Sequence, residues 1–206
     1  LRREAVAELD RQRAQPKGWR LESSGFSVSG SELSAGGVNP KPETRNPELI
    51  VLVRSLSQLD AALAADVGIL YCDFEDPKKY REAVARVRTR NPEPGTRNPE
   101  IWVAPPRIFK PGEEWILNQV RSCAADGYLV RNYDHLRCFA DCRRLGDFSL
   151  NVANALTAEH FKNQFGLERL TPSYDLNPTQ LEAPLQAAPP ERFEVTIHQH
   201  IARFHM

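Results

Sequence analysis

The chain has 206 residues with 27 basic and 27 acidic side chains, a balance that excludes a strongly basic nucleic-acid coat and an acidic solvating tail. Hydrophobic residues make up 41% of the sequence, which suits one domain with a core and excludes wholesale disorder. No apolar run approaches the roughly 18 residues of a membrane span, and the opening sequence lacks the apolar region of a secretory signal, so we expect a cytoplasmic protein with no membrane partner.

The first 48 residues differ in composition from the rest of the chain. Residues 1–15 carry sparse apolar positions among Arg and Glu and are expected to form a helix from a preceding domain. Residues 16–48 are rich in Gly, Ser, Pro and Asn, which is typical of an irregular linker. The chain begins with Leu and ends at Met206 in a dense polar and aromatic run, so we interpret it as a fragment with further domains before and after it.

From residue 49 to residue 206, apolar runs alternate with segments of helical character. The runs begin near Leu49, Gly68, Ile101, Gly127, Asp147, Leu170 and Phe193. Helix starts are predicted at Ser55 with Gln58, Asp76–Pro77, Thr157 and Asn177–Pro178, and further helices over 112–125 and 133–144. This alternation predicts parallel strands with crossover helices. Seven such strands without a Gly-rich phosphate loop favour an α/β fold of the (β/α) TIM-barrel-like type, incomplete or open, in residues 49–206.

The sequence TRNPE occurs three times, at 44–48, 89–93 and 96–100. Each copy precedes a predicted strand, which places it at the amino edge of the sheet, whereas barrel enzymes carry their chemistry at the carboxyl edge. We therefore expect the copies to be inserted surface loops, with a binding motif as the alternative.

Two segments alternate strictly between apolar and polar residues. They are DFSLNV, from Asp147 to Val152, and FEVTIHQH, from Phe193 to His200. As strands, they would place their apolar faces under the helices and their polar faces inside the barrel. A polar interior indicates a functional site, and a satisfied structural hydrogen-bond network is the alternative.

Polar residues also stand at the ends of the predicted strands, which converge at one edge of a parallel sheet. We expect one concavity there, lined by Asp73, Arg107, Asn132, Asn151, Asp175, His198 and His200. His198 and His200 share a strand face, so they suit either two ligands of one metal ion or an acid/base or structural pair. His135 and His160 fall in predicted helices and are expected at the surface. The four cysteines are expected to be small buried hydrophobes.

Six segments resemble, in order, the collagenase-like peptidase U-32 family: YCDFEDPKKYREAV, PPRIFKPGEE, GYLVRN, GDFSLNVAN, LERLTPSYDLNPTQL and FEVTIHQHIARFHM. The resemblance implies a barrel-type enzyme. Some members of that family are described as peptidases, and others look like oxygen-independent hydroxylation factors with an iron–sulfur cluster. By this resemblance the cysteines that hold the cluster would follow Met206, so the cluster or metal is expected only in a longer protein.

Three functions stay open at this point. The first is proteolysis as a hydrolase, which requires a peptide substrate. The second is cluster-dependent hydroxylation of an RNA base or a quinone precursor, and Arg54, Arg107 and Arg131 are candidates for contacts with RNA. The third is a non-catalytic scaffold or binding piece.

Overall fold

The structure is a computed structural model that describes residue 11 and residues 48–90 and 98–199. Internal contacts divide the chain into two units, Leu1–Arg45 and Asn46–Met206. The elements described below belong to the second unit. Most of residues 1–48, the middle of the TRNPE region and His200 lie outside the described residues.

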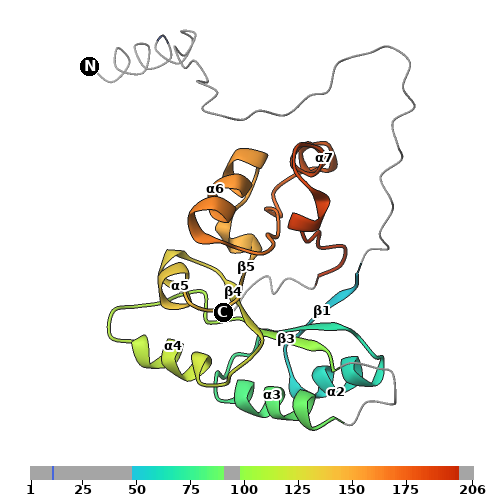
Figure 1. The fold of residues 1–206 in the computed structure, drawn as a ribbon, viewed down its shortest axis with the longest axis vertical. Coiled ribbons are helices and arrows are strands. Elements are labelled where there is room, and N and C mark those ends of the chain that lie inside the picture. Colours follow the sequence, from blue (N-terminus) through green and yellow to red (C-terminus); the bar gives the residue numbers. More distant parts are fainter. Residues whose placement is uncertain (1–10, 12–47, 91–97, 200–206) are drawn as a thin grey trace. The chain divides into compact units, whose positions relative to one another are not determined.

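Five parallel strands form one sheet in the order β1–β2–β3–β4–β5. The strands are β1 (Ile50–Val53), β2 (Ile69–Cys72), β3 (Glu100–Val103), β4 (Gly127–Val130) and β5 (Arg144–Gly146). Spatial order follows chain order, so every crossover leads to the neighbouring strand (Figure 1). The expected α/β class with a parallel sheet is confirmed.

The helices are α2 (Leu56–Ala64), α3 (Lys79–Thr89), α4 (Glu114–Arg121), α5 (Tyr133–Cys138), α6 (Ala155–Phe165) and α7 (Pro178–Ala187). The side chain of Ser55 caps α2, and Asn177 forms a capping box with Gln180 at α7, as predicted. The cap of α6 is Asn154 instead of Thr157, because the Asn154 side chain accepts the Thr157 N–H at 2.8 Å. Within the described ranges, no helix is long and apolar enough to cross a bilayer.

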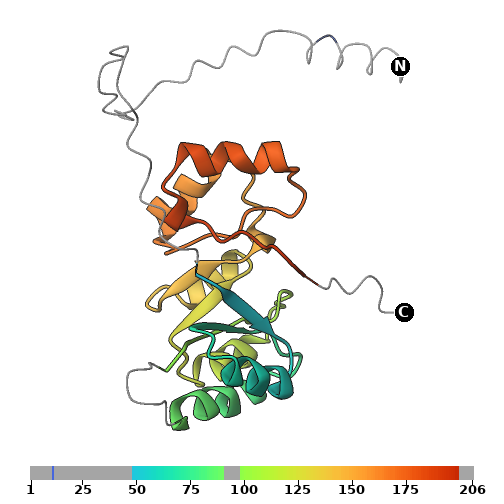
Figure 2. The ribbon, with the colours of Figure 1, turned by 90° about the vertical axis from the view of Figure 1, so that its right-hand side faces the viewer.

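Both faces of the sheet are apolar. On one face Leu70, Cys72 and Val103 lie in a buried cluster with residues of α2, α3 and α4, which line up along that face in Figures 1 and 2. The opposite face carries Ile69, Tyr71, Trp102, Leu129 and Leu145, all buried. The polar interior is predicted from residues 147–152 and 193–200, and neither segment is one of the five strands, whose second face is filled mainly by large hydrophobic side chains.

The predicted strand at 147–152 is wrong, and its residues follow β5 as a short 3₁₀ helix, Phe148–Leu150. The reason is local. The carboxylate of Asp147 accepts the N–H of Ser149 at 3.0 Å and so caps a turn, a use of short polar side chains that competes with strand formation. Asn151 then ends the turn in the left-handed region, at φ 55°.

The predicted sixth and seventh strands are reduced to isolated parallel bridges, Gly146 to Leu170, Val152 to Pro172 and Leu170 to Phe193. Pro172 has no N–H to donate, so the pairing cannot extend past it toward residues 194–199. The sequence pattern also predicts that the apolar side chains between Phe193 and His200 are buried on one face of a strand. This prediction is wrong, because the side chains of Val195 and Ile197 are 44% and 86% exposed. Seven regular strands are therefore not present among the described residues.

Candidate functional site

The buried side chain of Arg131 organises the carboxyl edge of the sheet. Its Nε donates to Asp147 Oδ2 at 2.8 Å, and its two terminal nitrogens lie 2.9 and 2.8 Å from the two carboxylate oxygens of Asp73. Arg131 follows β4, Asp73 follows β2 and Asp147 follows β5. One guanidinium group therefore connects the ends of three strands.

The two carboxylates differ in their exposure to solvent. The Asp147 side chain is 6% exposed and also accepts hydrogen bonds from Ser149, whereas the Asp73 side chain is 18% exposed. Burial alone would lower the pKa of Arg131, but the hydrogen bonds and charges of Asp73 and Asp147 outweigh burial and raise the pKa. The group therefore carries one positive and two negative charges, with Asp73 as its accessible member.

His135 supports Arg131 from the buried side. The ring is fully buried, and its Nδ1 accepts the backbone N–H of Arg131 at 3.2 Å. Burial is the main cause that lowers the pKa of His135 to about 4, and the positive charge of Arg131 is the second. A hydrogen bond with the backbone of Pro106 acts in the opposite direction but is weaker. The imidazole is therefore neutral at pH 7. The expectation that His135 lies at the surface is wrong, whereas His160 is exposed as predicted.

An aromatic stack adjoins this ion cluster. The rings of Phe148 and Tyr174 are stacked with their centroids 3.9 Å apart, and Cζ of Arg107 lies 4.4 Å from the Phe148 centroid. Burial chiefly raises the pKa of Tyr174, and Asp147, Arg107 and Arg131 all act on it electrostatically, which places the stack beside the cluster.

Three of the seven predicted site residues are brought together by these contacts. Asp73 binds Arg131, and Asn132 donates to the carbonyl oxygen of Arg107 at 3.0 Å while it caps α5. The hydrogen bonds of Asn151 and Asp175 are local: Asn151 bonds to Phe148, and the Asp175 N–H donates to Ser173. His198 is exposed, and His200 lies outside the described residues.

The prediction omitted five residues of the site from its set: Arg131, His135, Asp147, Phe148 and Tyr174. Arg131 and Tyr174 stand at predicted strand ends, so their position was a usable signal. No sequence pattern indicates that His135 is buried, because its hydrogen-bond partner is the backbone N–H of Arg131, which every residue other than proline has. The sequence pattern places Asp147 and Phe148 at the beginning of a strand, whereas in the structure they follow the carboxyl end of β5.

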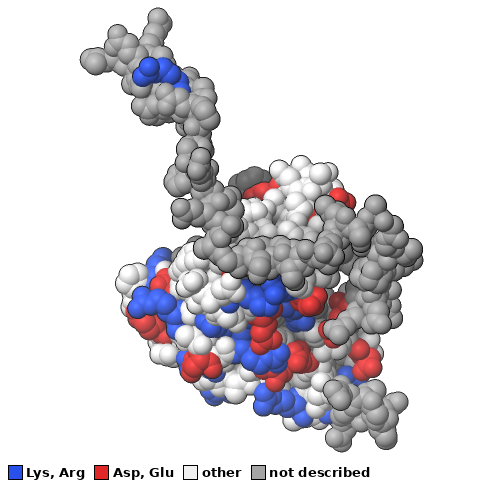
Figure 3. Space-filling view, turned by 45° about the horizontal axis from the view of Figure 1, so that its top comes forward, with Lys and Arg blue, Asp and Glu red and all other residues white. Residues whose placement is uncertain are grey.

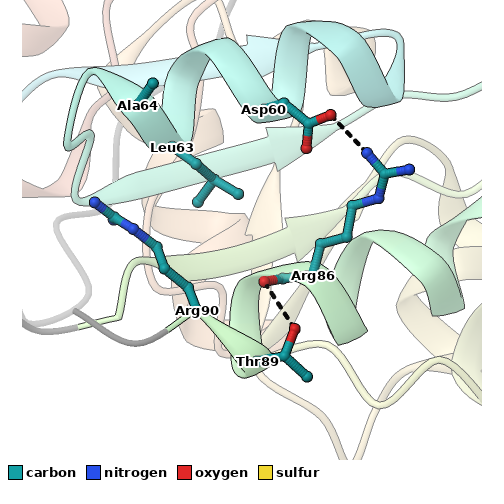
Figure 4. Close-up of a pocket in the computed structure, with 6 residues that line it drawn as sticks. All are labelled: Asp60, Leu63, Ala64, Arg86, Thr89 and Arg90. Carbon is teal, nitrogen blue, oxygen red and sulfur yellow. Dashed lines mark hydrogen bonds and ion pairs between the residues drawn. The ribbon is translucent and has the colours of Figure 1, made fainter.

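Two cavities of the protein lie elsewhere. One of about 400 Å³ lies between α2 and α3, where Asp60 pairs with Arg86 at 2.6 Å (Figure 4). The other, of about 530 Å³, is lined by Glu48, Gly68, Ile69, Asn98, Glu100, Arg143, Glu168 and Arg169. Its lining includes the first residues of β2 and β3, so it lies at the amino edge. The described parts of the first and third TRNPE copies border it, as their predicted location requires.

Charge and metal-ligand patterns add two findings. Positive and negative side chains intermingle on the face shown in Figure 3. Among the residues that the structure describes, no three His, Cys, Asp or Glu side chains are placed to hold a metal ion.

Comparison with known proteins assigns this chain to no family. No family model matches it, and no curated protein matches it. Similar solved structures include a muconate cycloisomerase from Azorhizobium caulinodans, with 12% identity and a TM-score of 0.47, and MenC from Desulfotalea psychrophila LSv54, with 16% identity and a TM-score of 0.44. Each match covers 72% of this chain and 45% of the other, so the chain spans less than half the length of these proteins.

The resemblance to the peptidase U-32 family is therefore wrong. No family model and no curated protein supports it. The peptidase and iron–sulfur hydroxylase functions rested on that resemblance and are corrected with it. The structure itself shows an α/β fold with a parallel sheet and an ion cluster at the carboxyl edge of that sheet.

Proposed function

We propose that the carboxyl edge of the sheet is the active site of an enzyme that acts on a small polar molecule, with Asp73 as its catalytic carboxylate. The observation that carries this proposal is the ion cluster, in which a buried arginine holds a partly exposed carboxylate by two contacts. In α/β proteins with parallel strands, ligands bind outside the carboxyl ends of the strands.

The composition of the cluster also favours a functional role. Desolvating a guanidinium and two carboxylates is costly, and well-packed hydrophobic residues of similar volume often give equal or greater stability. A charged group retained in such a place is therefore better explained by chemistry than by stability. The proposal extends to the fold: Leu170 and Phe193 would occupy the sixth and seventh strand positions of an incomplete barrel.

The geometry assigns a role to each group. Both carboxylate oxygens of Asp73 contact Arg131, which fixes the plane of the carboxylate, and further lone pairs remain to accept a proton or hydrogen bond from a substrate O–H or N–H. Asp147 binds the Nε side of Arg131, and His135 binds its backbone N–H. Asp147 and His135 are thus positioning residues, because they act on Asp73 through Arg131.

The test is turnover of small molecules. The purified chain is incubated with the small-molecule fraction of a cell extract, and compounds consumed or formed are followed by mass spectrometry. We expect at least one compound to change with the wild type and with Asp60→Asn, a matched carboxylate on α2 outside the site, but not with Asp73→Asn. The proposal is overturned if Asp73→Asn performs the same conversion, or if the wild type performs none.

A further inference from the structure

The stack beside the ion cluster includes an arginine whose N–H donors bind no protein oxygen among the described residues. Tyr174 and the guanidinium of Arg107 lie close to the Phe148 ring, and one ring face cannot hold both at 3.9 and 4.4 Å. They therefore cover opposite faces of Phe148. Within the described part of the chain, the N–H groups of Arg107 donate to no protein oxygen, although the residue's own carbonyl accepts from Asn132.

This arrangement places the guanidinium of Arg107, an exposed residue, against an aromatic ring, and no oxygen of the described residues accepts from its N–H groups. Stacking on an aromatic ring immobilises the planar group, and the fork of N–H donors then matches two oxygens of a carboxylate or phosphate. Asn132 fixes the backbone of Arg107 from the start of α5, so the loop that carries Arg107 is tied to the same edge as Arg131.

Three other arginines of the described chain differ because they pair with carboxylates. Arg131 pairs with Asp73 and Asp147, and Arg143 is stacked on Trp102 but binds Glu168 and Glu100. Arg86 pairs with Asp60 and Glu82. Arg107 is stacked, has no carboxylate partner among the described residues, and acts electrostatically on Tyr174 together with Asp147 and Arg131 of the ion cluster, and this combination points to a ligand.

We propose that Arg107, held on Phe148, is the subsite that binds a carboxylate or phosphate group of the substrate. The inference rests on the proposed function and adds the class of substrate, a small anion whose O–H or N–H group lies toward Asp73. Arg107 would then bind the anionic end of the substrate, and Asp73 would face the end that reacts.

The test measures anion binding to the whole chain. Inorganic phosphate and malonate are titrated separately, and the backbone amide resonances of residues 107 and 148, which every variant retains, are followed by nuclear magnetic resonance. We expect the wild type and Arg137→Gln, an exposed arginine of α5, to bind at least one anion. Loss of two charge-assisted hydrogen bonds should weaken binding by about tenfold or more in Arg107→Gln. Arg107→Lys and Phe148→Leu should fall between, because lysine keeps the charge but lacks the two-pronged donor group, and leucine removes the aromatic ring against which Arg107 is stacked.

The two anions separate the two kinds of substrate: binding of phosphate alone indicates a phosphorylated compound, and binding of malonate alone a carboxylate. Equal affinity in Arg107→Gln and the wild type, or binding of neither anion, overturns the subsite. Melting temperatures of all variants verify that each is folded. Asp73→Asn should keep its anion affinity. If it does so but still catalyses turnover, the proposed function fails and the subsite stands.

Discussion

The hydroxyl of Tyr71 donates a hydrogen bond of 2.5 Å to Glu194, a residue 123 positions away in the sequence. Glu194 lies just after the last parallel bridge and also contacts Arg169 at 2.7 Å. Tyr71 belongs to the face of β2 that also carries Ile69, next to Trp102 and Leu129 of the neighbouring strands. The bond therefore joins the second strand of the sheet to the segment that follows the bridge between Leu170 and Phe193.

The Tyr71–Glu194 bond predicts a measurable loss of stability. Tyr71→Phe removes the donor from a largely buried carboxylate, so the free energy of unfolding should fall by about 1 to 3 kcal/mol. Tyr133→Phe is the matched control, since Tyr133 is 60% exposed, and it should have little effect. Urea denaturation measures both. Equal effects of the two substitutions would contradict a structural role for this bond.

Arg131 should be the most sensitive charged residue of the site. Arg131→Met leaves the buried Asp147 without a counter-charge, which costs about 3 to 5 kcal/mol. Adding Asp147→Asn should recover part of that loss, because the new side chain is neutral. Arg86 also pairs with two carboxylates but in solvent, so Arg86→Met should destabilise the protein far less than Arg131→Met. Denaturant unfolding that gives similar losses for Arg131→Met and Arg86→Met would refute the cluster.

His135 predicts a pH dependence of stability. Its folded pKa of about 4 lies below the ordinary value of 6.5, so the unfolded chain binds the extra proton first as the pH falls. Stability is complete above pH 6.5 and is lost between there and pH 4, by about 2 kcal/mol from pH 7 to pH 5 for this group. The comparison is wild type against His135→Gln, with His160→Gln as the exposed control. An unchanged slope in His135→Gln would contradict the burial of a neutral imidazole.

Two glycines at the amino ends of strands should respond differently to alanine. A Cβ at Gly127 would lie 2.0 Å from the buried ring of Trp102, whereas a Cβ at Gly68 meets only Glu48, at 3.7 Å. Gly127→Ala should therefore destabilise by about 1 to 3 kcal/mol or more through overpacking. Gly68→Ala should stay within about 0.5 kcal/mol. The melting temperatures of the two variants measure this difference. If Gly127→Ala melts at the temperature of the wild type, β3 and β4 are less closely packed than described.

Local patterns predicted much of the fold. The strands β1 to β4 are apolar runs, and α2 and α7 begin at capping residues, so each signal lies within a few neighbouring positions. β5 has only three residues and gave no such signal. The alternation after Asp147 suggested a strand because period-two patterns cannot report that a side chain caps its own turn.

The site was less predictable because its contacts are distant in sequence. Asp73 and Asn132 stand directly after strands, so their place at the carboxyl edge followed from topology. The pairing of Arg131 with Asp73 spans 58 positions, and no local pattern selects that partner over another carboxylate. His198 was chosen for its chemistry in a predicted strand, and it lies in an exposed segment without regular structure.

The most direct test of the central claim is to locate where small molecules bind. The ¹⁵N-labelled chain is mixed with the small-molecule fraction of a cell extract, and amide chemical shifts are compared with those of the free protein. The account predicts that the shifts change at Asp73, Arg107 and Arg131, and that Asp73→Asn alters this response. Changes confined to Gly68 and Glu100 at the amino edge, or to Asp60 and Arg86 between α2 and α3, would contradict an active site at the carboxyl edge of the sheet.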